Sequence, residues 1–378
     1  MEIGTIISPI LYSSVYYTTI TIICMLTSFY YILSNGQTIL QRNQHEKPPF
    51  FALVFAILIT VFIGLRPVSG IFIDMTMYAH VYENIITDYS PFSLSTEWLW
   101  DNITFFCKEI GLSTTNYFLV IATIYIGTAF SCCLILLRNN VWIAFLFIAS
   151  SFSFIGYGTN GLCNGTACHI FLLGIALFTS KGKKKYIGFL LCLSTIAIHR
   201  ACMLPFAMLL LSLYVVKQPK QAINIWIASI GVSLVFGNSF ANIVTYFGID
   251  ERMNEYLKAQ GSPNILAENP KAGSFRFDFL LYSAMPVLMF WYVTVKRNFK
   301  DRTYNLIAIT YILANSFWVI IIRASQSNRF AYLSWFIYPL VIAYPLLHFN
   351  IWKNQDQKAA IILLLYAGFT FTMFLLGK

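Results

Sequence analysis

Residues 196–213, IAIHRACMLPFAMLLLSL, place an ionisable pair, His199 and Arg200, inside a run that is otherwise suited to lipid. A charge near a bilayer centre costs roughly 2.5–3.5 kcal/mol, so such a side chain usually faces a protein cavity. Lysines flank the run on both sides, and cytoplasmic flanks are typically basic. The pattern therefore predicts a hairpin of two short helices, Tyr186–His199 and Met203–Val216. His199 and Arg200 lie at its turn, on the far side of the membrane, where we expect one wall of an active site.

The composition indicates a polytopic membrane protein that forms one domain over residues 1–378. Of the 378 residues, 58% are hydrophobic and only 11% are charged, which is typical of chains that cross a bilayer repeatedly. About twelve spans are expected, near 14–33, 50–65, 116–137, 141–156, 166–179, 186–199, 203–216, 222–240, 279–295, 304–322, 331–347 and 359–376. Several are shorter than the roughly 20 residues of a straight span, so we expect broken or tilted helices in 141–179 and 186–216.

The net charge of +10 is better explained by membrane orientation than by nucleic-acid binding, because no basic run is interleaved with stacking aromatic residues. With the N-terminus outside, the cytoplasmic connections hold 15 of the 25 basic residues but only 3 of the 15 acidic ones. Cytoplasmic loops carry an excess of Lys and Arg. Both termini are therefore predicted to be periplasmic.

Two connections on the outer side are long. The first, Arg66–Thr115, contains a predicted surface helix, Thr96–Ile110, with Glu97 in its first turn and Gly111 at its C′ position. Its face of Leu99, Ile103, Phe106 and Ile110, together with Trp98 and Trp100, is expected to lie at the bilayer interface. The second, Ala241–Arg276, has a short helical stretch at Glu251–Ala259 and is either a lid over a substrate or an inert connection.

The arginines on the outer side are the first candidates for ligand binding, because basic residues are disfavoured there. They are Arg66, Arg200, Arg323 and Arg329. A guanidinium binds phosphate oxygens with a bidentate fork, so a group of them suits a lipid-linked pyrophosphate. The alternative is that they pair with lipid headgroups or with outer acids such as Asp74 and Asp278.

His199 is the candidate general base, because an imidazole titrates near neutrality and can take a proton from a sugar hydroxyl. The alternative is a structural histidine bonded to a backbone carbonyl at a helix break. His169 is a weaker competitor that we expect to serve packing. Asp74 and Tyr78 lie four residues apart and share a helix face, and Asp74 has three open roles: metal binding, orientation of a cation or pairing with Arg66.

No metal and no cofactor are predicted. The sequence lacks clustered carboxylates, and the eight cysteines have no metal-ligand spacing. Any catalysis is therefore expected to be metal-independent, with arginine stabilising the leaving pyrophosphate. The segment Gly156–Thr166, GYGTNGLCNGT, predicts either non-helical backbone that lines a cavity or an ordinary hairpin loop.

These motifs resemble the EpsG-like branch of the Wzy-type polysaccharide polymerases. The matching residues run in the family's order over about residues 60–340: Arg66 with Asp74 and Tyr78, Asn160-Gly161, Ile198-His199, and Arg329-Phe-Ala-Tyr332. One position departs from the family pattern. The family's Arg-Gln pair falls on Cys163 and Asn164, which implies that Arg200 or Arg323 takes over one phosphate contact.

The resemblance implies an all-helical, GT-C-like glycosyltransferase of the bacterial inner membrane that works on its periplasmic face. Such enzymes join undecaprenyl-pyrophosphate-linked oligosaccharide units. The implied partners are the lipid-linked donor and acceptor, the surrounding membrane lipids and a chain-length regulator protein. The implied roles are a base (His199), pyrophosphate ligands (Arg66, Arg200, Arg323, Arg329) and sugar-orienting residues (Asp74, Tyr78, Asn160, Tyr332). Direct displacement by one base predicts inversion at the anomeric carbon. The open alternatives are an O-antigen ligase and a flippase for the same lipid-linked substrate.

Overall fold

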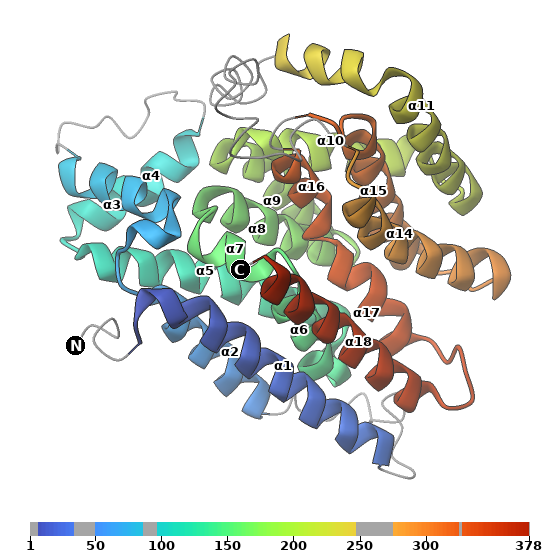
Figure 1. Ribbon diagram of the computed structural model, residues 1–378, viewed down its shortest axis with the longest axis horizontal. Helices are drawn as coiled ribbons and strands as arrows, with labels where there is room; N and C mark the ends of the chain where they lie inside the picture. Colours follow the sequence, from blue (N-terminus) through green and yellow to red (C-terminus); the bar gives the residue numbers. More distant parts are fainter. Residues whose placement is uncertain (1–6, 34–49, 86–96, 247–274, 325–326, 378) are drawn as a thin grey trace. The chain divides into compact units, whose positions relative to one another are not determined.

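The computed structural model describes residues 7–33, 50–85, 97–246, 275–324 and 327–377, and these form helices and no strand (Figure 1). The first half contains α1 (Pro9–Leu33), α2 (Phe50–Gly64), η3 (Gly70–Phe72), α3 (Asp74–Asn84), α4 (Trp98–Glu109), α5 (Thr114–Leu136), η4 (Arg138–Asn140), α6 (Val141–Ala149), α7 (Phe154–Thr159), α8 (Leu162–Phe178) and α9 (Lys184–Ile198). The second half contains η5 (Arg200–Cys202), α10 (Met203–Tyr214), α11 (Pro219–Tyr246), α14 (Phe277–Trp291), η6 (Tyr292–Lys296), α15 (Arg302–Ile320), α16 (Asn328–Trp335), α17 (Tyr338–His348) and α18 (Gln355–Leu376).

The all-helical structure agrees with a multi-pass membrane protein, and the expected number of about twelve spans stays a prediction. Within the described ranges, seven helical segments are long and apolar enough to span a bilayer, and three apolar helices are shorter. The break expected in 141–179 is present, because α6, α7 and α8 are separate helices. The predicted non-helical backbone in Gly156–Thr166 is confined to Asn160 and Gly161, since α7 and α8 cover the rest.

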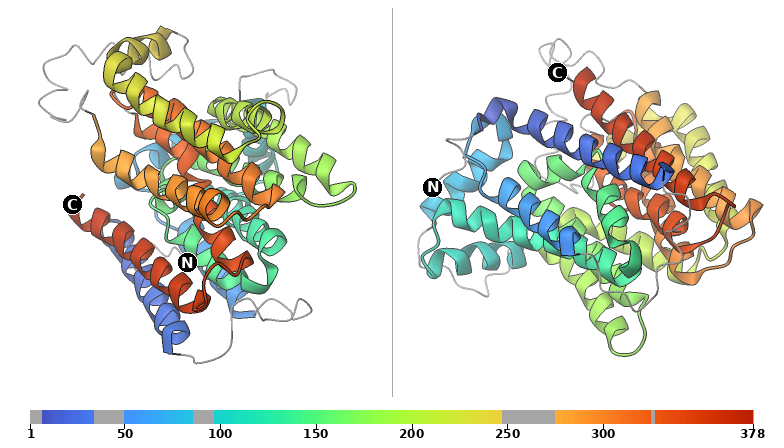
Figure 2. Two further views of the ribbon diagram at one scale, coloured as in Figure 1. Left: turned by 90° about the vertical axis from the view of Figure 1, so that its right-hand side faces the viewer. Right: turned by 90° about the horizontal axis from the view of Figure 1, so that it is seen from below.

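The chain divides into two compact units, residues 1–199 with 343–378 and residues 200–342. In the first unit, the first helix of the chain packs against the last one. Helix α1 lies alongside α18 (Figures 1 and 2), and the hydroxyl of Ser28 donates to the carbonyl of Ala360 at 2.9 Å. The last helix of the chain therefore completes the packing of the first.

In the first unit, α8 and α9 form a tightly packed antiparallel hairpin. A Cβ atom added at Gly174 would lie 2.6 Å from Sγ of Cys192, and one added at Gly188 would collide with the backbone of Phe178. Small residues at a helix interface let two backbones approach closely, as is common in membrane proteins. This close approach brings the start of α8 to the end of α9, where His199 lies.

In the second unit, a buried polar network joins four helices, and Figure 2 shows α11 against α14 and α15. The amide of Asn315 on α15 donates to Ser283 on α14 at 3.1 Å and to Ser334 on α16 at 3.0 Å. It also accepts from the indole of Trp226 on α11 at 2.8 Å. Fully satisfied polar networks of this kind fix a unique packing in a low-dielectric interior, so they set the position of α16 and its residues.

The surface helix expected at Thr96–Ile110 forms as α4, and Gly111 takes the C′ position with φ of 75°. The prediction that Trp100 lies at the bilayer interface is wrong, because Trp100 is only 6% exposed and packs against Tyr78. Trp98, Phe106 and Ile110 are exposed and are the interfacial candidates. The predicted helix Glu251–Ala259 and the lid loop around it lie outside the described residues.

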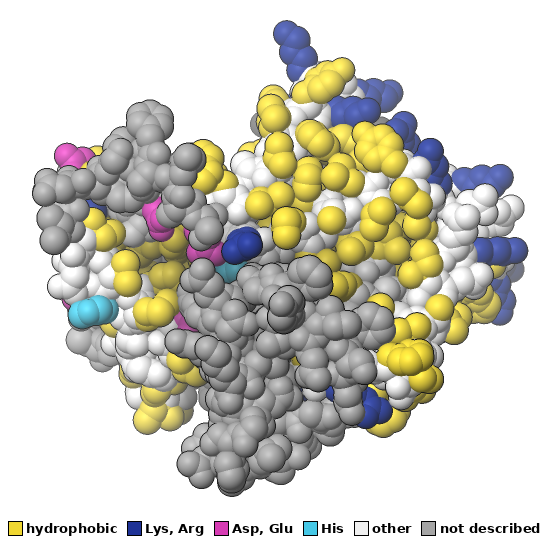
Figure 3. All heavy atoms as spheres, turned by 90° about the horizontal axis from the view of Figure 1, so that it is seen from above, with side chains coloured by type: hydrophobic (Ala, Val, Ile, Leu, Met, Phe, Trp, Pro, Cys, Tyr) yellow, Lys and Arg dark blue, Asp and Glu magenta, His cyan; other side chains and the backbone are white. Residues whose placement is uncertain are grey.

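Large apolar side chains cover much of the visible described surface (Figure 3). Leu33, Phe50 and Leu376 are each more than 70% exposed. Exposed apolar area on this scale is untypical of a soluble monomer and marks a surface that meets lipid.

Candidate functional site

His199 lies directly after the last residue of α9, where the backbone becomes extended with φ of −144° and ψ of 119°. Its backbone N–H still donates to the carbonyl of Thr195 at 2.9 Å, so the histidine is fixed to the helix end. The imidazole is partly exposed and faces a carboxylate: Nε2 lies 3.9 Å from Oε1 of Glu97. The predicted base is therefore at a helix break, but its ring has a charged neighbour.

Glu97 is a residue that sequence reasoning placed only in the first turn of a surface helix. It occupies the N-cap position of α4, yet its side chain makes no capping hydrogen bond. Glutamate is also not among the residues favoured at that position, which are Ser, Thr, Asp and Asn. The sequence gives no signal for this contact, because an acidic residue in the first turn of a helix is ordinary, and the N-cap position of Glu97 is known only from the structure.

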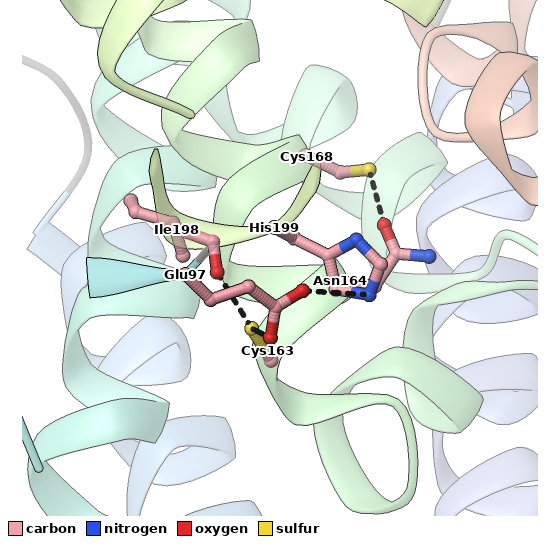
Figure 4. Close-up of polar contacts among 6 residues, drawn as sticks. All are labelled: Glu97, Cys163, Asn164, Cys168, Ile198 and His199. Atoms are coloured by element: carbon pink, nitrogen blue, oxygen red, sulfur yellow. Dashed lines mark hydrogen bonds and ion pairs between the residues drawn. The ribbon is translucent and has the colours of Figure 1, made fainter. Parts of the chain in front are cut away.

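Cys163 stands where the family pattern has an arginine, and the structure gives it a structural partner. In the first turn of α8, its Sγ donates to the carbonyl of Ile198 at 2.9 Å and lies 3.8 Å from Oε2 of Glu97 (Figure 4). The last carbonyls of a helix have no partner within the helix, and here a thiol from α8 supplies one. Cys163 thus contacts both the residue before His199 and the acid beside it.

Arg66 lies in the first unit and is only 2% exposed. Its Nη1 donates to the carbonyl of Ile63 at 2.5 Å and its Nη2 to the carbonyl of Thr159 at 3.0 Å. The guanidinium also lies over the ring of Phe118, 5.4 Å from its centroid. Burial lowers the pKa of Arg66 to about 10, so it is protonated at neutral pH. This arginine connects the end of α2 to the end of α7.

Asp74 and Asn160 meet through a hydrogen bond between distant parts of the first unit. The backbone N–H of Asp74, the first residue of α3, donates to Oδ1 of Asn160 at 2.8 Å. The preceding residue, Ile73, has no side-chain oxygen, so Asn160 replaces the N-cap that α3 lacks. The carboxylate of Asp74 remains partly exposed.

Tyr78 and His169 have packing contacts. The ring of Tyr78 on α3 lies 5.6 Å from that of Trp100 on α4, which holds together the two helices between α2 and α5. His169 is buried, its Nδ1 lies 2.9 Å from the carbonyl of Gly165, and its ring contacts Tyr125. The packing role expected for His169 agrees with these contacts.

The second unit holds the other predicted ligands of pyrophosphate. Arg200 is exposed and begins η5, while Arg323 and Arg329 are partly buried and flank the start of α16. The guanidinium of Arg323 lies 5.8 Å from the ring centroid of Phe275, and its buried Nε has no hydrogen-bond partner among the described residues. Tyr332, one turn after Arg329, packs against Trp335.

Asp278, considered as a partner for the outer arginines, pairs with a different one. Its two carboxylate oxygens accept from Nε and Nη2 of Arg276 at 3.0 and 2.7 Å. The pair lies at the start of α14, and the Arg276 guanidinium also covers the ring of Phe279 at 3.7 Å. Asp278 is therefore satisfied locally, and Arg276 is a cation that sequence reasoning did not single out.

In the part of the chain that the structure describes, no three His, Cys, Asp or Glu side chains come together to form a metal-binding site. Among the described residues Asp74 therefore belongs to no cluster of the oxygen ligands that a divalent cation prefers. What the described residues offer is a histidine beside a carboxylate in one unit and a set of guanidinium groups in the other.

Comparison with known proteins relates the chain to a family. A sequence model of the EpsG family matches residues 50–377. No curated protein and no solved structure matches the chain.

Proposed function

The chain belongs to the EpsG family, which is associated with Wzy-type polysaccharide polymerases, and on that footing we propose that it polymerises undecaprenyl-pyrophosphate-linked oligosaccharide units. The growing chain is the donor and the incoming lipid-linked unit is the acceptor. The family match covers all the motif residues from Arg66 to Tyr332. The proposal is thus a glycosyl transfer between two lipid-linked substrates in the membrane.

The observation that carries the proposal is the position of His199, whose partly exposed imidazole lies 3.9 Å from the Glu97 carboxylate. In the proposed step, the acceptor hydroxyl oxygen attacks the anomeric carbon of the donor and forms the new glycosidic bond. The bond from that carbon to the pyrophosphate breaks, and its electron pair stays on the pyrophosphate oxygen. The hydroxyl proton passes to His199, which acts as the general base. A single displacement of this kind inverts the anomeric configuration.

The leaving pyrophosphate needs positive charge, because a negative charge develops on its bridging oxygen. We assign this role to Arg200, Arg323 and Arg329, whose side chains are exposed or only partly buried. Arg66 is committed to two carbonyl groups. We therefore propose that it orders the segment that carries Asp74 rather than contacting phosphate directly.

We propose that the residues that bind or orient the sugars are Asp74, Tyr78, Asn160 and Tyr332. Asp74 offers a partly exposed carboxylate, and carboxylates accept hydrogen bonds from sugar hydroxyls. Asn160 uses Oδ1 to hold α3, so its part is to position Asp74. The charge distribution of the connecting loops supports a periplasmic site with both termini outside, and the GT-C-like architecture belongs to the same proposal.

The testing experiment is an elongation assay with purified protein in detergent or liposomes. The probe is the lipid-linked oligosaccharide extracted from source cells that lack this protein. We expect a ladder of longer lipid-linked products that persists in EDTA and disappears in His199→Ala, since loss of a general base costs about 10²–10⁴ in rate.

Other outcomes point to the alternatives. Glycan transferred only to a lipid A core would identify a ligase, and transport across liposomes without lengthening would identify a flippase. Product with retained anomeric configuration would contradict the single displacement, and loss of the ladder in EDTA would contradict a metal-independent transfer.

A further inference from the structure

The carboxylate of Glu97 is directed away from its own helix. At the N-cap position a side-chain oxygen ordinarily accepts from a backbone N–H of the first turn, but Glu97 makes no such bond. Its Oε1 instead lies 3.9 Å from Nε2 of His199, and Figure 4 shows the carboxylate and the imidazole edge facing each other. The carboxylate of Glu97 therefore lies beside the histidine and does not cap its own helix.

The neighbouring contacts hold both partners in place. Sγ of Cys163 donates to the carbonyl of Ile198 at 2.9 Å, which fixes the residue before His199, and it lies 3.8 Å from the second oxygen of Glu97. Cys168, further along the same helix, donates to Oδ1 of Asn164 at 3.3 Å, which is a contact within α8. Three helices, α4, α8 and α9, thus meet at the histidine.

A carboxylate beside one ring nitrogen has two consequences for an imidazole that acts as a base. It favours the tautomer with the proton on the facing nitrogen, here Nε2, which makes Nδ1 the nitrogen that carries the basic lone pair. It also stabilises the imidazolium that forms when that lone pair takes a proton. The distance of 3.9 Å exceeds a direct hydrogen bond, and catalytic hydrogen bonds commonly tighten only when substrate is bound.

We propose that Glu97 is the positioning residue of His199: it holds the imidazole with Nε2 protonated and Nδ1 as the basic nitrogen, while Cys163 fixes the backbone before the histidine. This inference rests on the proposed polymerase function for its kinetic consequence but not for its structural one. Glu97 itself touches no reacting atom.

The structural consequence can be measured without substrate. Protein labelled with ¹⁵N-histidine reports the tautomer of each ring by NMR, and His199→Ala identifies the signal. We expect the Nε2-protonated form of His199 in the wild type and a mixture of tautomers in Glu97→Gln. An unchanged His199 signal in Glu97→Gln would overturn the proposal.

The kinetic consequence is measured in the elongation assay over a range of acceptor concentrations. We expect Glu97→Gln to lower kcat about tenfold or more with little change in KM, because the group that orients a catalytic histidine acts on the chemical step. Glu97→Asp should recover part of that loss, since the charge is retained. Glu109→Gln is the matched control, because it makes the same change at the exposed far end of the same helix and should leave the rate unchanged.

A double variant separates positioning from a general structural role. In a His199→Ala background, Glu97→Gln should add no further loss, because residues that act as one unit are strongly non-additive. An additive loss, or a lowered melting temperature in Glu97→Gln and Glu97→Asp alike, would show a structural role and overturn the proposal. If the wild type lengthens chains while Glu97→Gln does so equally well, only the Glu97 inference fails. If folded wild type lengthens nothing, the polymerase proposal fails, and the tautomer measurement still decides whether Glu97 orients the ring.

Discussion

Oδ1 of Asn160 accepts a hydrogen bond of 2.8 Å from the backbone N–H of Asp74, which lies 86 positions earlier in the chain. The neighbouring carbonyl of Thr159 accepts from Arg66 at 3.0 Å. The segment after α2 is therefore joined to the corner between α7 and α8 at two successive residues. Motif residues that are far apart in the sequence form one connected structure.

Replacing Asn160 by alanine should release the start of α3 and misplace Asp74. The N–H of Asp74 would lose its partner, and an unsatisfied donor of this kind costs about 1–3 kcal/mol. We expect Asn160→Ala to lower the melting temperature and the elongation rate together, whereas Asn160→Asp keeps an acceptor oxygen and retains more of both. Asn84→Ala, at the exposed end of the same helix, is the control. A wild-type melting curve for Asn160→Ala would show that the hydrogen bond contributes nothing.

Arg66→Lys should destabilise the protein although the charge is kept. One ammonium cannot reproduce the fork that reaches the carbonyls of both Ile63 and Thr159, and the carbonyl left without a donor costs about 1–3 kcal/mol. Thermal unfolding in detergent should show a lower melting temperature. Saturating lipid-linked substrate should raise the melting temperature of Arg66→Lys by as much as it raises that of the wild type, because a ligand stabilises the native state that binds it. A smaller rise in the variant would instead indicate that Arg66 binds phosphate.

Arg329→Lys should impair activity without loss of stability. A bidentate guanidinium–phosphate contact is replaced by a point charge, and hydrogen bonds to charged groups are worth about 1.5–3 kcal/mol, so we expect about a tenfold to hundredfold loss in kcat/KM. Arg138→Lys, at an exposed residue, provides the matched comparison in the elongation assay. Equal rates in the two variants would remove Arg329 from the list of pyrophosphate ligands.

Gly188→Ala should disrupt the α8–α9 hairpin. The added Cβ would collide with the backbone of Phe178, and overpacking of this kind costs about 1–3 kcal/mol. Folded yield and melting temperature should fall, and activity with them, because His199 ends α9. Gly127→Ala on α5 meets no atom within 4 Å and should behave as wild type. If both substitutions were equally well tolerated, the close helix approach would not be required.

The positions of the helices could be read from the sequence because their cause is local. A segment that crosses lipid must satisfy its own backbone hydrogen bonds, so long apolar runs such as 116–137 and 359–376 predict helices by composition alone. The C-terminus of α4 could also be predicted, since a glycine such as Gly111 after the last apolar residue is typical of a helix end. The face that α4 buries could not be predicted. Trp100 packs against Tyr78 rather than lipid, because α3 covers that side of the helix.

The partners of the site residues could not be predicted, because tertiary packing determines them. Glu97 and His199 are brought together by the approach of α4 to α9 and by Cys163 on α8. Hydrophobic periodicity says nothing about which two helix ends meet. Arg66 illustrates the same limit. Its position after an apolar run suggested a ligand contact, whereas two carbonyl groups at helix ends occupy its terminal nitrogens.

The pairing of α1 with α18 has a consequence for how the chain is made. The residues that α1 buries, Tyr12, Tyr16, Ile20, Cys24 and Ser28, lie on one side of the helix, and Ser28 bonds to Ala360, 332 positions later. At a synthesis rate of about 5–20 residues per second, that interval lasts roughly 20–70 s. During this time the ribosome completes the whole of residues 200–342 before the helix that covers Ser28 exists. A nascent chain arrested before residue 360 therefore has α1 in the membrane without that partner, and only the last stage of translation closes the first unit.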